Sequence, residues 1–525
     1  AMAEARGRAG TLMILQPGVP LRNSRRYVVA VRGLKVRGTM EDALASEGFA
    51  RLRDGRPDGE EEKERRERFD GRVFPAIEGK GWRRSEVQLA WEFSTVSWKS
   101  GPARTQHMVG DAVSRLSSGE HASGYSIDDV VREECSGGMR KGRQIWGTLD
   151  GPSYTVSPGP GTELLRVLHG GVPIANGGVK VRFVALLPCS ALGKASTVDY
   201  VVQYGHGLMA SRSEAIRSNW LRSFAEKHRV AVVAIDWAGM SSFDVPIVLK
   251  ILLSDLGKFS VLPDQLQQGF VNGASLIWYL RNKLLDDQAF LGTSGQKLMA
   301  KDTPVHFYGI SQGGILGSGY VLSSPFIKRA TLSVPGNPFA LIFTRSSNFY
   351  GGYLQALSVQ VTRKTHIRLI LTLIQQLWDV GEGAGWFSGL YYKDEHSGLD
   401  TEQRFLLQDT LGDSQVPTLA AQLTARSLGC STVRRETRSV YGLTEEQPPM
   451  VTGSALVEYA YRGTMPEPLD NTACDSRTNH HETVRRDPFG QEQVASFFQY
   501  GEIRQTCEAE RCVNLEEPNG YDRFV

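Results

Sequence analysis

The sequence lacks a hydrophobic run long enough to cross a membrane. Its most membrane-like segment, HIRLILTLIQQLW at 366–378, contains Arg368 and two glutamines. That segment falls well short of the roughly 20 apolar residues that span a bilayer. We therefore expect no transmembrane segment.

The sequence also lacks an excess of charge of one sign. Its 525 residues include 60 Lys and Arg against 57 Asp and Glu, a net charge of +3, and no basic tail is present. Nucleic-acid binding normally needs a concentrated positive surface. We expect no nucleic-acid partner, and the apolar fraction of 41% is enough for a sizeable core.

Cysteine is scarce, with six residues in the whole chain. Only Cys507 and Cys512 are close together, so they are the expected disulfide pair, with Cys474 as a competitor. A bound metal would need further ligands, which we do not find nearby. A disulfide points to an oxidising compartment, and we expect a secreted or cell-surface protein. The N-terminus offers no signal-peptide-like apolar region, and we expect truncation at that end.

Two regions with different patterns follow one another along the chain. Residues 1–130 contain short runs rich in β-branched and aromatic residues, which predict a small β-rich accessory region. Residues 140–525 alternate continuous apolar runs with segments of helical spacing. Strands covered on both faces have such runs, so we predict an α/β domain with a mostly parallel sheet and helices on both faces.

The segment HFYGISQGGILGSG, at 306–319, places Ser311 between a predicted strand and a predicted helix. Gly309 and Gly313 flank it in a G-x-S-x-G pattern. A turn this sharp brings neighbouring backbone very close, which only glycine tolerates. The pattern predicts a nucleophile elbow, whose serine needs a histidine base and a carboxylate that orients the base.

Both partners follow in the chain order that such a sheet requires. Asp413 comes directly after the apolar run RFLLQDTLG, whereas its competitor Asp409 lies inside that run. The paired histidines His480 and His481 follow the next strand-like run, and the residues alone leave the choice between them open.

An oxyanion hole needs two backbone N–H groups near the serine. Gln312, directly after the serine, supplies one of them. The H-G dipeptide at His206 and Gly207 ends an earlier predicted strand, and its glycine would let the N–H of Leu208 point toward the substrate. We predict that Gln312 and Leu208 form the hole.

The segment between the serine and the acid, about 337–405, is rich in aromatic residues and leucine. It is either a set of core helices or a cap that lines an apolar acyl pocket. If it is a cap, Trp386 and Phe387 are our candidates for residues that line the pocket.

Residues 175–505 resemble the serine esterase and lipase superfamily of bacterial-type α/β-hydrolases. The resemblance rests on an ordered set of segments: YGHGL, DWAGMS, LPDQLQQG, YGISQGG, GDSQVP and HETVRR, which begin at 204, 236, 262, 308, 412 and 481. It implies an α/β-hydrolase fold with Ser311 as nucleophile, Asp413 as acid and His481 as base, and it implies no cofactor. The N-terminal region resembles the Ig-like β region that precedes the hydrolase in such chains.

The function that these residues predict is hydrolysis of a carboxylic ester, with a small-molecule or lipid-like ester as substrate. An acyltransferase or a peptidase could use the same triad. A cell-surface binding protein without turnover is an alternative of a different class.

Overall fold

We analysed a computed structural model of the chain. It describes residues 13–506 apart from 37, 133–134, 136–140, 157–163, 168–170, 195, 395–396, 401, 434–437, 462, 465–466 and 469. The expected Cys507–Cys512 pair lies outside the described residues. The chain separates into two compact units, one of residues 21–98 and one of residues 1–20 and 99–525.

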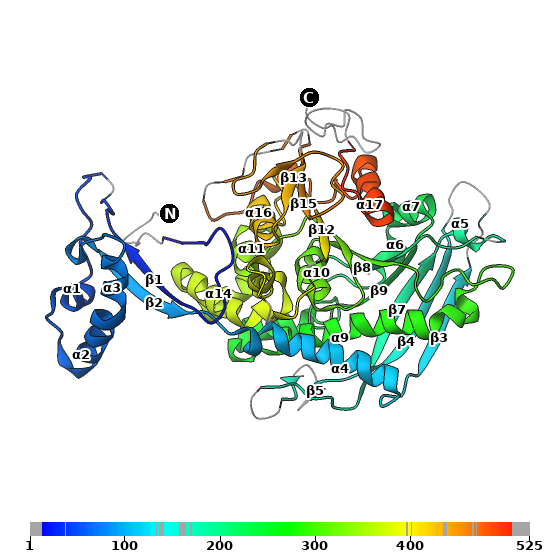
Figure 1. Ribbon diagram of the computed structural model, residues 1–525, viewed down its shortest axis with the longest axis horizontal. Coiled ribbons are helices and arrows are strands. Elements are labelled where there is room, and N and C mark those ends of the chain that lie inside the picture. Colours follow the sequence, from blue (N-terminus) through cyan, green and yellow to red (C-terminus); the bar gives the residue numbers. More distant parts are fainter. Residues whose placement is uncertain are drawn as a thin grey trace. The chain divides into compact units, whose positions relative to one another are not determined.

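The large unit is built on an eleven-stranded sheet with the order β14-β13-β15-β12-β11-β10-β8-β9-β7-β4-β3 (Figure 1). The strands are β3 (Tyr125–Arg132), β4 (Arg143–Pro152), β7 (Gly178–Leu187), β8 (Val201–Gly205), β9 (Ala231–Ile235), β10 (Val305–Ile310), β11 (Arg329–Ser333), β12 (Arg404–Thr410), β13 (Ser431–Val433), β14 (Glu445–Glu446) and β15 (Ala455–Tyr459). The eight strands β9, β8, β10, β11, β12, β15, β13 and β14, which are neighbours in this order, are parallel to one another. The pairs β3–β4, β4–β7 and β7–β9 are antiparallel. A two-stranded sheet of β5 (Thr155–Val156) and β6 (Leu164–Leu165) lies apart from it.

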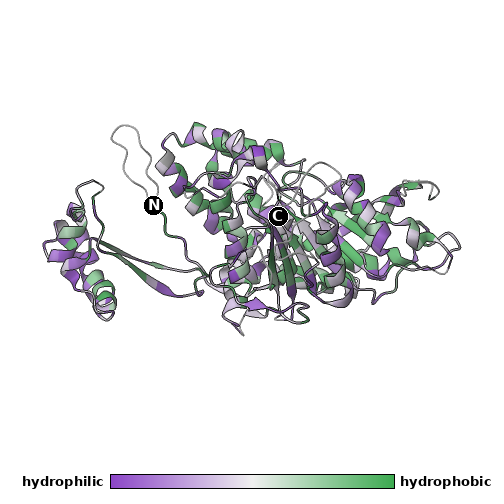
Figure 2. Ribbon diagram, turned by 90° about the horizontal axis from the view of Figure 1, so that it is seen from above, coloured by the Kyte–Doolittle hydropathy of each residue, from purple (hydrophilic) through white to green (hydrophobic). Residues whose placement is uncertain are grey.

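Helices cover both faces of the large sheet. Neighbouring residues of a strand point to opposite sides, so one strand contacts helices on both faces. On β10, Tyr308 packs with Trp220 and Phe224 of α7, whereas Phe307 packs against Tyr320 of α10. The helices outside the β11–β12 insertion are α4 (Pro102–Ser118), α5 (Cys189–Leu192), α6 (Glu214–Arg217), α7 (Asn219–His228), α8 (Val245–Ser254), α9 (Val261–Asn282), α10 (Gln312–Ser323), α16 (Thr418–Ser427) and α17 (Pro488–Tyr500). Figure 2 shows hydrophobic strands at the centre of this unit. The predicted α/β-hydrolase fold is confirmed.

The described residues between β11 and β12, where the sequence predicts a cap or core helices, form five α-helices. They are α11 (Phe339–Arg345), α12 (Ser347–Tyr350), α13 (Tyr353–Gln360), α14 (Lys364–Trp378) and α15 (Phe387–Tyr391). Helix α14 contains the whole of the segment 366–378 that looked most like a membrane span. Among the described residues, no helix has both the length and the apolar character needed to cross a bilayer.

The smaller unit differs from the β-rich region expected over residues 1–130. Its described residues form one two-stranded sheet, β1 (Arg26–Val31) with β2 (Leu89–Ser94), and three α-helices, α1 (Glu47–Asp54), α2 (Gly59–Arg68) and α3 (Phe74–Glu78). An immunoglobulin-like region would have two packed sheets. Residues beyond 98 belong to the large unit because α4 packs on α9 and β3 extends the large sheet. Short strand-like runs alone could not distinguish an isolated two-stranded sheet from an edge of the main sheet.

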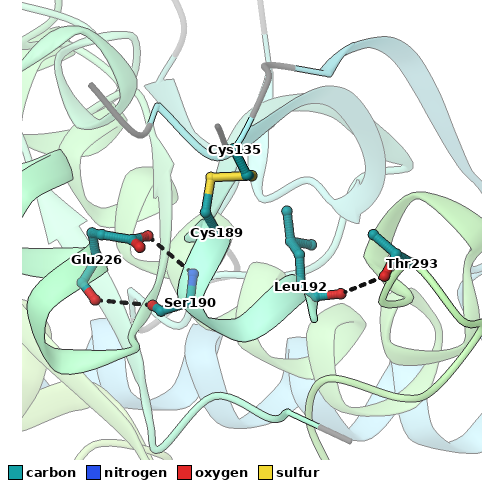
Figure 3. Close-up of a disulfide and its surroundings, with 6 residues drawn as sticks. All are labelled: Cys135, Cys189, Ser190, Leu192, Glu226 and Thr293. Carbon is teal, nitrogen blue, oxygen red and sulfur yellow. Dashed lines mark hydrogen bonds between the residues drawn. A yellow bond between two sulfur atoms is a disulfide. The ribbon is translucent and has the colours of Figure 1, made fainter. Parts of the chain in front are cut away.

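A disulfide joins Cys135, just beyond β3, to Cys189 at the start of α5 (Figure 3). Helix α5 is also held by hydrogen bonds of Ser190 with Glu226, and the Thr293 hydroxyl donates to the Leu192 carbonyl. The two cysteines are 54 residues apart in sequence, so close spacing could not reveal the pair. The free cysteines among the described residues, Cys430 and Cys474, are buried.

Candidate active site

Ser311 lies in a strained turn between β10 and α10. Its φ of 53° and ψ of −122° fall in a region that residues with a Cβ atom rarely occupy. Such a conformation costs on the order of 1–3 kcal/mol and persists only where surrounding contacts hold it. One of these contacts is a 2.9 Å hydrogen bond from the Ser311 N–H to the Ser333 carbonyl. This strained turn from strand to helix is the backbone geometry that the sequence predicts for a nucleophile elbow.

The two flanking glycines are required by close backbone contacts. A Cβ atom on Gly309 would lie 2.2 Å from the carbonyl oxygen of Gly313, and one on Gly313 would lie 2.1 Å from that of Gly205. Both distances are far below a normal nonbonded contact. The predicted elbow thus needs glycine at both positions for a steric reason.

Asp413 and His481 are brought together, although 68 residues separate them in sequence. The Asp413 Oδ2 atom lies 2.6 Å from Nδ1 of His481, and both side chains are buried. The other carboxylate oxygen of Asp413 accepts hydrogen bonds from the N–H groups of Gln415 and Val416, at 2.7 and 3.1 Å. Asp413 is therefore held in one orientation, and it fixes the orientation of the imidazole ring.

The two alternatives from the sequence lie in different surroundings. No described residue donates to either carboxylate oxygen of Asp409, and burial together with the charge of Asp413 raises its pKa well above the usual value. His480 packs against the ring of Tyr461, with 5.4 Å between the centroids. Of the two histidines, the described lining of the cavity at Ser311 includes His481 only.

Three consecutive N–H groups follow β8 in the loop that was predicted to form part of the oxyanion hole. The N–H of Gly207 donates to Glu214 Oε2 at 2.9 Å, and that of Met209 donates to Gln312 Oε1 at 3.3 Å. Between them, the N–H of Leu208 has no acceptor among the described residues. This N–H group is therefore available to a ligand. The N–H of Gln312 begins α10, where the first turn has no intrahelical acceptor.

His206 has a structural place in this loop. Its Nε2 atom accepts a hydrogen bond from the Trp237 N–H at 3.0 Å, and its Nδ1 atom lies 2.9 Å from the Gly207 carbonyl. Burial lowers the pKa of His206, so the neutral ring with hydrogen on Nδ1 satisfies both contacts. The amide of Gln312 also donates to the Met240 carbonyl at 2.8 Å and thereby ties the elbow to a second loop.

Two cavities meet at Ser311. One, of about 20 Å³, is lined mainly by apolar side chains: Leu208, Met240, Ser311, Gln312, Ile315, Leu316, Phe339, Ile342, Asn348, Phe349, Trp378, Gln415 and Val416. The other, of about 400 Å³, is more polar and is lined by Gly207, Leu208, Ala210, Glu214, Ile310, Ser311, Asn348, Gln415, His481, Glu482 and Arg485. We call them the apolar half and the polar half of the site.

Sequence reasoning missed the aromatic residues that line the apolar half. Phe339, Phe349 and Trp378 do so, whereas the candidates Trp386 and Phe387 are buried and absent from the described lining of both halves. All five lie in the 337–405 segment, and no spacing signal separates one group from the other. Among the described residues, no group of three or more histidine, cysteine or carboxylate side chains is arranged to hold a metal ion.

No protein-family model matches this chain, and no curated protein matches it. Solved structures are similar to it in fold. An acetyl xylan esterase from a Thermoanaerobacterium species is 12% identical, with 70% of this chain and 90% of that chain covered and a TM-score of 0.39. An S-formylglutathione hydrolase from Agrobacterium tumefaciens is 13% identical, with 70% and 99% covered and a TM-score of 0.33. A Pyrococcus horikoshii acylaminoacyl peptidase is 11% identical, with 63% and 41% covered and a TM-score of 0.35.

Proposed function

We propose that this protein is a serine hydrolase that cleaves carboxylic esters through an acyl-enzyme. The observation that carries the proposal is that Ser311, in its strained turn, lines the same cavity as His481. The Nδ1 atom of His481 lies 2.6 Å from Oδ2 of Asp413. Serine is a weak nucleophile at neutral pH unless an oriented base takes its proton. A strained turn, a buried carboxylate–imidazole pair and free N–H groups together meet that need.

In the proposed reaction, Ser311 Oγ attacks the ester carbonyl while His481 takes the hydroxyl proton. The N–H groups of Leu208 and Gln312 donate to the oxyanion, and His481 then gives its proton to the departing alcohol. Water, deprotonated by His481, attacks the acyl-enzyme, and the acid product leaves with Ser311 restored. Asp413 keeps the hydrogen of the imidazole on Nδ1 throughout and stabilises the imidazolium.

An acyltransferase or a peptidase would use the same residues, since these enzymes differ in acceptor or leaving group rather than in the triad. Added alcohol or amine acceptors that yield transfer products faster than hydrolysis would favour the transferase. If the protein hydrolysed and transferred none of the esters tested, a cell-surface binding role would fit instead.

The test is release of 4-nitrophenol from 4-nitrophenyl butyrate by the intact chain and by Ser311→Ala. We expect turnover that Ser311→Ala abolishes, together with labelling of Ser311 by a fluorophosphonate, located by mass spectrometry. Ser318→Ala is a matched control, because Ser318 lies in the helix that follows Ser311 and its buried hydroxyl donates to the Ile315 carbonyl. The same slow background with all three proteins would overturn the proposal.

A further inference from the structure

The two halves of the site differ in chemistry, and only one of them contains the predicted base. His481 lines the polar half, whereas the apolar half is lined by Ser311, Leu208 and Gln312 without it. In acyl transfer the base protonates the leaving group, which must therefore lie on the side of the imidazole. The acyl chain then has to lie on the other side of the serine.

We infer, on the basis of the proposed function, that the substrate joins an aliphatic acyl group to a polar alcohol. The apolar half would receive the acyl chain and the polar half the alcohol. This assigns a substrate class and an orientation to the site.

The aromatic wall of the apolar half supports the acyl assignment. Phe339 stacks on Trp378 with 4.7 Å between ring centroids, and it contacts the ring of Phe349 edge-on at 5.6 Å. The aliphatic side chains of Ile315, Leu316 and Ile342 line the same side of Ser311. A polar or charged acyl group would lose its contacts with water there, whereas an aliphatic group would not.

The polar half offers groups that bind hydroxyl and carbonyl oxygens. Arg485 is buried and pairs with Glu482, yet no described residue accepts hydrogen bonds from its Nε and Nη1 atoms. Glu214 accepts from the hydroxyl of Tyr204 at 3.0 Å, and it also lines this half. An apolar alcohol would leave the Nε and Nη1 atoms of Arg485 without an acceptor, at a cost in binding energy.

Asn348 and Gln415 line both halves and mark the boundary between them. The Asn348 amide donates to Gln415 Oε1 at 2.8 Å, so the pair is fixed beside Ser311. Asn348 belongs to the insertion between β11 and β12, and Gln415 follows Asp413. The ester bond would lie at this boundary.

Two isomeric esters test the orientation directly. In 2-hydroxyethyl hexanoate the acyl group is apolar and the alcohol is polar, whereas hexyl glycolate reverses both. We expect kcat/KM for the hexanoate to be at least about tenfold higher, after each value is divided by the rate constant of alkaline hydrolysis. An equal or inverted ratio would overturn the inference while the proposed function stood, whereas no hydrolysis of any ester would defeat the proposed function itself.

A matched pair of variants tests the acyl assignment. With 4-nitrophenyl esters, the ratio of octanoate to hexanoate turnover reports how the aromatic wall limits the acyl chain, because the apolar half has a volume of only about 20 Å³. Phe349→Ala should raise the ratio of octanoate to hexanoate turnover by about threefold or more. Phe387→Ala also removes a buried aromatic ring of the same segment, but from outside the described lining, and should leave that ratio unchanged. Equal shifts in both variants would contradict the assignment.

Discussion

A glutamate lies beside each half of the site, Glu382 at the apolar half and Glu482 at the polar half, and the two differ in charge state. Glu382 lies behind the apolar half, fully buried, and accepts hydrogen bonds from the Phe339 N–H and the Gln375 amide. Burial, together with the nearby Asp379, raises the pKa of Glu382 to about 8. At neutral pH this carboxyl group is therefore mostly uncharged.

Glu482 lines the polar half and has a cation on either side. Partial burial raises the pKa of Glu482, but the charges of Arg485 and Arg486 lower it by more, so the net shift is downward. Glu482 is charged at neutral pH. Of these two glutamates, only Glu482 has cations beside it among the described residues. In the proposed orientation of the substrate, this is the side on which His481 transfers protons.

The largest effect that the comparison predicts is at the histidine pair, because proton transfer should belong to the polar half alone. His481→Ala should lower kcat by at least about a thousandfold, as expected for a triad member. His480→Ala should cost less than about tenfold and act through packing on Tyr461. Steady-state kinetics on one activated ester, with folding checked by circular dichroism, measures both. A larger loss at His480 would move the base to that residue.

The next effect separates the two aspartates. Asp413→Asn should reduce kcat by about a thousandfold, because the amide favours the wrong imidazole tautomer. Asp409→Asn should change kcat less than about threefold, since burial and the charge of Asp413 raise the pKa of Asp409 and so favour its uncharged form, which an amide resembles. If Asp409→Asn were the more damaging substitution, the acid would lie inside the strand rather than after it.

A smaller effect is expected for the side chain of Gln312, which we regard as a positioning residue. Gln312→Met keeps the backbone N–H but removes the hydrogen bonds to Met209 and Met240. We expect kcat to fall about tenfold with KM within about twofold, because oxyanion contacts strengthen in the transition state.

Gln203→Met is the control for Gln312→Met, since Gln203 is equally buried but bonds to Gly273 and Tyr320 instead. It should lower the melting temperature without a matching loss of kcat. A raised KM with unchanged kcat in Gln312→Met would show that its side chain contributes to ground-state binding rather than to the oxyanion hole.

The smallest effect concerns stability rather than turnover. The pKa of Glu382 is raised on folding, so its contribution to stability is complete below about pH 4.5 and is lost as the pH rises toward 8. Glu382→Gln should therefore raise the melting temperature at pH 9 by a few degrees and change it little at pH 4.5. Thermal unfolding followed by circular dichroism at both pH values measures this.

Glu482→Gln should show the opposite dependence. The pKa of Glu482 is lowered on folding, so its stabilising contribution is present above the unfolded pKa and is lost at acidic pH. The variant should be less stable than the wild type at neutral pH and similar to it at low pH. If the melting temperatures of both variants depended on pH in the same way, the proposed difference in charge state between the two glutamates would be wrong.

The fold and the elbow could be predicted because their signals are local. Gly309 and Gly313 are dictated by backbone contacts within a few residues and from one neighbouring strand. Asp413 was favoured because it follows a buried strand, and the structure places it beside His481.

The lining of the apolar half could not be predicted, because it depends on how helices pack. Trp378 and Trp386 are both fully buried, eight positions apart in similar surroundings, yet only Trp378 belongs to the described lining. The Cys135–Cys189 bridge likewise depends on the fold, since its two residues meet only when β3 pairs at the edge of the sheet. Such relations are set by tertiary structure and leave no pattern in a single sequence.

The aromatic wall and the proposed triad come from different stretches of chain. Helices α11, α12 and α14 supply the rings, whereas Ser311, Asp413 and His481 follow or lie between strands of the sheet. Under the proposed function, the range of acyl groups that the site accepts can therefore change without any substitution in the proposed triad. A combinatorial library confined to these three helices is the natural starting point for redirecting the protein to new acyl chains.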